Sequence, residues 1–152
     1  MAGPKQAAAV LKRDDDLVAA MRTAIDQTSG TADERLDRMA ILIKDYVADA
    51  KEAHTEPCSL TFKDAYSRYV SRWSDLADTV ASHPHIQSEE EALVNAFLRS
   101  FSGDFAGATR QLQETDAWGQ QVGMKADEVT RARRETGNVL HSDIDAAQKL
   151  FE

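Results

Sequence analysis

Four side chains in this sequence are potential zinc ligands, namely His54, Cys58, His83 and His85. Imidazole nitrogens and thiolates are common ligands of Zn²⁺, and these residues form two closely spaced pairs. The sequence between the pairs, however, has the pattern of a helix about 30 Å long, so we expect the pairs at opposite ends of it. We therefore predict no metal site within one copy of the chain, with the histidines in solvent-exposed loops and the thiol partly buried.

Carboxylates are numerous, but their arrangement does not indicate an acid–base catalyst. Such a site brings titratable groups together in a desolvated pocket, whereas nearly all acidic residues here fall on predicted outer faces or in first turns of helices. Asp14, the first residue of an acidic triplet, is a candidate cap for a helix start. His141, Asp143 and Asp145 share helical spacing, yet no nucleophile accompanies them in a recognisable elbow. The sequence thus predicts neither a catalytic site nor a bound cofactor.

The densest basic cluster comprises Lys125, Arg131, Arg133 and Arg134. Acidic residues interleave with it and the chain has a net charge of −8, so we predict a solvated helix face rather than a phosphate-binding surface. No apolar run reaches the roughly 18 residues that span a bilayer. These features argue against nucleic acid and membrane as partners. The single cysteine, Cys58, and the lack of a signal-peptide pattern favour a cytoplasmic location.

Helices must position all of these residues, because apolar side chains recur at helical spacing through most of the chain. The clearest example is the segment 61–82, whose large apolar side chains share one face. They are Phe62, Tyr66, Tyr69, Val70, Trp73, Leu76 and Val80. A face this wide cannot remain exposed, so the other segments must supply surfaces that cover it.

The predicted architecture is an all-α antiparallel bundle of about five helices in a single domain, residues 1–152. We predict a tail at 1–4 and helical segments at 5–29, 31–54, 61–82, 88–102 and 104–152. Thr31 with Glu34 fits a capping box at the start of the second segment, and Ser88 with Glu91 fits another at the start of the fourth.

The last segment, 104–152, contains no proline and has an apolar period close to seven residues. It is predicted to be either one long helix or a helix broken near residue 137. Gly119 and Gly123 lie within its pattern, where they allow another helix to approach closely or bend this one.

The leading functional hypothesis is a non-catalytic interaction module, a subunit, adaptor or scaffold that binds a protein partner or itself through the long C-terminal helix. If that helix extends beyond the others, its apolar seam requires a partner. The candidate partner-binding residues are Trp118, Val122, Val129, Arg133 and Leu140.

Three alternatives remain open from the sequence. One is a small acidic inhibitor or immunity-type protein whose carboxylates mimic a nucleic-acid backbone. Another is a ligand-binding bundle or enzyme with a pocket lined by Tyr66, Tyr69, Trp73 and Trp118. The last is a membrane-associated helical dimer that uses its basic face.

Overall fold

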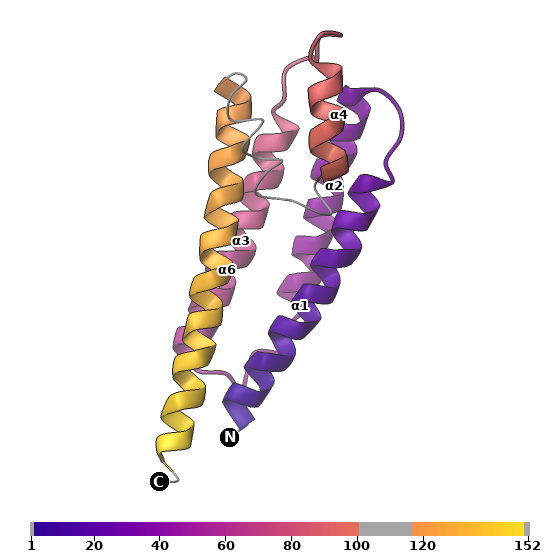
Figure 1. The fold of residues 1–152 in the computed structure, drawn as a ribbon. Coiled ribbons are helices and arrows are strands. Elements are labelled where there is room, and N and C mark those ends of the chain that lie inside the picture. The colour runs from indigo at the N-terminus through magenta and orange to yellow at the C-terminus, as the bar shows by residue number, and fades with distance from the viewer. Residues whose placement is uncertain (1, 101–116, 151–152) are drawn as a thin grey trace.

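The computed structural model describes residues 2–100 and 117–150, and within these ranges the chain forms five helices and no strand. They are α1 (Ala2–Asp26), α2 (Ala32–Lys51), α3 (Leu60–Ala81), α4 (Glu91–Ser100) and α6 (Ala117–Lys149). Figure 1 shows α1, α2, α3 and α6 side by side with antiparallel neighbours, and the short α4 packs against α1 and α2. The predicted all-α bundle is confirmed.

The aromatic face of α3 lies at the centre of the bundle, as its spacing predicts. Trp73 and Phe62 are among the largest fully buried side chains, and the α3–α6 pair forms the most extensive helix contact. The buried face of α6 consists mostly of small residues, which are Gly119, Val122, Gly123, Ala126, Val129, Ala132 and Thr136. Small side chains opposite large ones allow two helices to approach closely, so α6 covers the aromatic face.

The N-terminal helix differs from its prediction in two ways. It begins at Ala2, so the predicted tail at 1–4 is wrong. A Cβ atom on Gly3 would lie only 2.9 Å from the Pro57 carbonyl oxygen, which shows that the first turn of α1 packs closely against the α2–α3 loop. Helix α1 also continues through Asp14, so this residue is not a helix cap.

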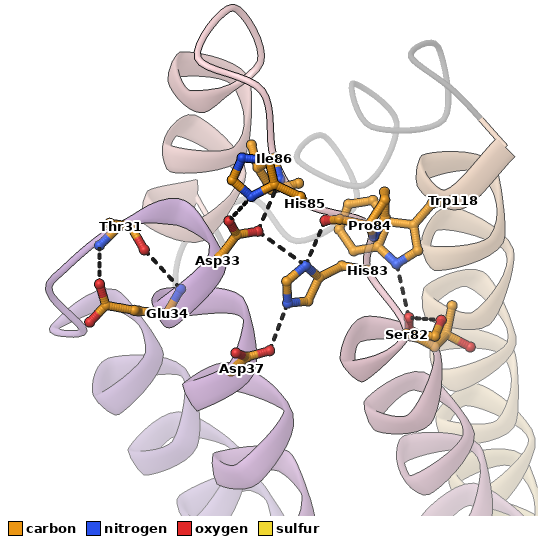
Figure 2. Close-up of polar contacts among 11 residues, drawn as sticks. Thr31, Asp33, Glu34, Asp37, Ser82, His83, Pro84, His85, Ile86 and Trp118 are labelled. Atoms are coloured by element: carbon orange, nitrogen blue, oxygen red, sulfur yellow. Dashed lines mark hydrogen bonds and ion pairs between the residues drawn. The ribbon is translucent and has the colours of Figure 1, made fainter.

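The helix starts show which capping predictions hold. The capping box at Thr31 is confirmed: the Glu34 N–H donates to the Thr31 hydroxyl at 3.2 Å, and the Thr31 N–H donates to the Glu34 carboxylate at 3.4 Å (Figure 2). Ser59 caps α3 by accepting from the Phe62 N–H at 3.1 Å. The box predicted at Ser88 is wrong, because α4 begins only at Glu91.

Helix α6 is continuous from Ala117 to Lys149, so the alternative of a break near residue 137 is wrong. The Thr136 hydroxyl donates to the Ala132 carbonyl oxygen at 2.7 Å within the helix. Thr136 is also the last buried residue of α6, and residues 137–149 are exposed or half-buried. The predicted helical positions 104–116 lie outside the described residues.

Candidate functional site

The residues predicted to bind a partner through α6 are mostly used within the chain itself. Val122 and Val129 are only 0% and 3% exposed, so they belong to the core and offer no surface to a partner. The Trp118 indole N–H donates to the Thr79 carbonyl oxygen at 2.9 Å, and Arg133 pairs with Asp15 at 3.2 Å. Periodicity identified the apolar face of this helix correctly, but α3 covers that face.

The fifth candidate, Leu140, is partly buried and packs against the core. It lies in the part of α6 beyond the last buried residue. Among the described residues from 117 to 150, the exposed large hydrophobic side chains are Met124 on α6 and Leu150 just after it. These two positions are far apart along the helix axis and form no continuous apolar surface.

A buried polar cluster joins α1, α2 and α3. Asp14 is 0% exposed, and its carboxylate accepts hydrogen bonds from the hydroxyls of Tyr46 and Tyr69, the latter at 2.7 Å. Burial raises the pKa of Asp14, although both hydroxyls act in the opposite direction. Burial likewise raises the pKa of the two tyrosines. The cluster is enclosed by side chains, so its role is to hold three helices together.

A second polar cluster joins the start of α2 to the segment that follows α3 (Figure 2). His83 Nε2 lies 2.7 Å from Asp37 Oδ1, and His85 Nδ1 lies 2.6 Å from Asp33 Oδ2. The Ile86 N–H donates to the other oxygen of Asp33 at 2.9 Å. These contacts fix the chain between α3 and α4 against α2.

Charges in this cluster favour a protonated histidine beside ionised carboxylates. Burial lowers the pKa of His83, but the Pro84 carbonyl and Asp37 raise it by more, so the net pKa is above its ordinary value. The hydrogen bond from the Ile86 N–H, followed by His85, lowers the pKa of Asp33. The His83 side chain is 8% exposed, so its prediction as a solvent-exposed residue is wrong.

The two pairs of potential zinc ligands lie apart. Cys58 is buried just before α3 begins, whereas His83 and His85 follow the end of that helix. In the ranges 2–100 and 117–150, no three His, Cys, Asp or Glu side chains are grouped so that they could hold a metal ion.

The four aromatic residues proposed to line a ligand pocket do not share a cavity in the described structure. Tyr66, Tyr69 and Trp73 are buried in the core. Trp118 lies at the C-terminal end of α3, with its ring 6.2 Å from that of His83. The prediction of one pocket between them is therefore wrong.

The outer surface of the α2–α3 pair carries two hollows. The first, the Ile41 cavity, has a volume of about 270 Å³ and an apolar floor formed by Ala40, Ala77 and Ala81. Ile41 stands beside this floor and is 50% exposed, although it lies in the middle of α2. Half of a large aliphatic side chain is thus in contact with water next to other apolar groups.

The second hollow, the Lys63 cavity, has a volume of about 230 Å³ and lies between the same helices near the start of α3. Lys63, Ser67 and Val70 line it, and Ala77 and Ala81 line the Ile41 cavity. Positions spaced by three, four and seven residues fall on one face of a helix. The two cavities therefore lie on the same side of the helix pair, and we call the surface that carries both of them the α2–α3 groove.

The rims of this groove differ in charge. The Ile41 cavity is lined by Asp37, Asp45 and Asp78 and by one basic residue, Lys44, which forms an ion pair with Asp78 at 2.8 Å. The charged residues that line the Lys63 cavity are both lysines, Lys51 and Lys63. The groove is thus acidic at one end and basic at the other.

No protein-family model, curated protein or solved structure matches this chain. Among the described helices, none is both long enough and apolar enough to cross a membrane.

Proposed function

We propose that this chain is a non-catalytic helical protein-interaction module that binds a helix of another protein in the α2–α3 groove. The observation that carries the proposal is the exposure of Ile41 beside a floor of three alanines. Burial of apolar surface favours association by about 25 cal/mol per Å², and a small-residue floor allows a partner helix to come close.

A single helix fits this site better than a second copy of the same surface. A groove between two helices is filled by a ridge of side chains from a third helix. A two-fold dimer through this surface would instead place the groove of one copy against the groove of the other. The large exposed hydrophobic residues of the described chain are Ile41, Leu60, Met124 and Leu150. No described helix presents an outward row of them, so residues 2–100 and 117–150 of a second copy offer no suitable helix to insert. The occupant is therefore a helix of a different protein.

The proposal moves the binding surface away from α6. The sequence pointed to that helix because it is long and has an apolar period, but its apolar face is in contact with α3. In the α2–α3 groove, by contrast, apolar groups of two adjacent helices line a surface hollow, and Ile41 is 50% exposed beside them.

The test is a selection from a displayed library of amphipathic helical peptides, followed by amide chemical-shift mapping of the selected peptides on the full chain. We expect perturbations at residues 37–45 and 77–81. Ile41→Glu should weaken binding at least about tenfold, because it places a carboxylate in the apolar contact. Met124→Glu is the matched control, since Met124 is similarly exposed but lies on α6.

Two results would overturn the proposal. One is binding that maps elsewhere or is equally affected by both substitutions. The other is a concentration-dependent dimer in analytical ultracentrifugation that Ile41→Glu abolishes, since the occupant would then be a second copy.

A further inference from the structure

We infer that the partner helix in the α2–α3 groove carries its charges in two separate halves, a basic half over the Ile41 cavity and an acidic half over the Lys63 cavity. This inference rests on the proposed function and specifies the chemistry and the orientation of the partner. The opposite charges at the two ends of the groove carry it.

The acidic end attracts a basic segment even though it contains a lysine. Lys44 contacts both Asp78 and Ser74, each at 2.8 Å, so its ammonium is directed across the groove between α2 and α3. The cavity lining holds three carboxylates and this single ammonium, and the Asp37 carboxylate also lies 2.7 Å from His83 Nε2. The acidic end therefore keeps an excess of two negative charges when His83 is neutral and of one when His83 is protonated. Asp45 has no charged partner among the ion pairs of the described residues.

The basic end has the reverse preference. Lys51 and Lys63 come from different helices and flank the cavity that contains Ser67 and Ser71. Neither lysine forms an ion pair within the described part of the chain. Carboxylates on a partner would therefore find two available ammonium groups here.

The length of the groove sets the length of the partner segment. Asp37 and Lys51 lie fourteen residues apart on α2, which corresponds to about 21 Å along a helix axis. A partner helix of about four turns spans both cavities. Its apolar side chains at spacings of three and four residues meet Ile41 and the alanines, while its charged side chains reach the rims.

The experiment uses three synthetic peptides of about 16 residues that share one composition and one apolar face. The first has lysines in its N-terminal half and glutamates in its C-terminal half, the second has the reverse order, and the third has both evenly mixed. Because all three have the same net charge, non-specific attraction to the acidic chain is equal for all. We expect both segregated peptides to bind about three- to tenfold more tightly than the mixed one.

Orientation is read from a spin label at the peptide N-terminus. The label on the first peptide should broaden amide signals near Ala81, and the label on the second should broaden signals near Lys63, because the two peptides lie in opposite directions. Asp45→Lys should remove most of the preference for segregated charge. Asp16→Lys, the same change at an exposed site on α1, should leave that preference unchanged.

The outcomes separate this inference from the proposed function. Equal affinities of segregated and mixed peptides, with binding still dependent on Ile41, would overturn the charge assignment and leave the interaction function in place. Binding that does not depend on Ile41 in any of the three peptides would overturn both.

Discussion

Asp14 and Asp33 both join segments that are distant in the sequence, but they do so in opposite surroundings. Asp14 is fully buried, and its partners are the neutral hydroxyls of Tyr46 and Tyr69. Asp33 is partly exposed at the start of α2, and its partners are imidazoles and a backbone N–H. Water can replace lost partners at Asp33 but not at Asp14. The buried cluster should therefore dominate stability, whereas the exposed cluster should respond to pH.

Replacing Asp14 with alanine should have the largest effect. The substitution leaves two buried hydroxyls without their acceptor and opens a small cavity, so the free energy of unfolding should fall by about 2–5 kcal/mol. Asp16→Ala, an exposed neighbour on α1, should change it by no more than about 0.5 kcal/mol. Urea denaturation of both variants measures the difference, and equal effects would contradict the structural role of Asp14.

Tyr69→Phe should lower the free energy of unfolding by less than Asp14→Ala does, because it removes only one hydrogen-bond donor from the buried Asp14 carboxylate. A hydrogen bond to a charged group contributes about 1.5–3 kcal/mol. Tyr66→Phe is the matched comparison, because the Tyr66 hydroxyl donates to a neutral acceptor, the Ala50 carbonyl, at 3.0 Å. The Ala50 carbonyl also accepts from the Ala53 N–H, so it keeps a partner when the Tyr66 hydroxyl is removed. Tyr66→Phe should therefore lower the free energy of unfolding by only about 0.5–1.5 kcal/mol. Denaturation midpoints in the reverse order would show that Asp14 gains little from Tyr69.

The smallest effect is the pH dependence of the cluster around His83. Its folded pKa is raised, so the folded state holds the proton more tightly than the unfolded state. The stability that His83 contributes should be fully present below the unfolded pKa of about 6.5 and lost as pH rises through the folded pKa. The difference in unfolding free energy between the natural chain and His83→Asn should therefore shrink from about pH 6 to pH 9, by less than about 1 kcal/mol.

The groups that face His83 supply a control for this measurement. They are Asp33, Asp37 and the Pro84 carbonyl, with His85 also bound to Asp33. Asp37→Asn removes the closest carboxylate and should flatten the pH profile. A profile that instead grows with increasing pH would mean that burial, which lowers the pKa, outweighs these acceptors.

Much of the bundle was predictable because a helix records its buried face in its own sequence. The stripe from Phe62 to Val80 and the capping box at Thr31 depend on neighbours within a few residues, and both are present in the structure. The start of α1 was not predictable in this way, because Gly3 contacts Pro57, which is distant in the sequence.

The sites were harder to predict, although two signals were present. Tyr69 lies on the predicted apolar face of segment 61–82, and a buried hydroxyl requires a partner. Only the tertiary structure shows that this partner is Asp14, which also accepts from Tyr46. Ile41 lies between the buried residues Met39 and Ile43 but outside the apolar stripe of its helix, a position that is typical of an exposed residue. The sequence does not show which helix covers which face, because that depends on packing. The apolar face of α6 was therefore interpreted as a surface for a partner, whereas it packs against α3 in the core.

The start of α1 and the end of α6 lie at the end of the bundle where α3 begins (Figure 1). The Ile41 cavity is lined by Ala77 and Ala81, near the other end of α3. A tether or a fluorescent protein attached at either terminus is therefore remote from Ile41. If the chain is immobilised through such a tether, the Ile41 end of the groove faces the solution. Binding assays on a surface can then be compared directly with measurements in solution.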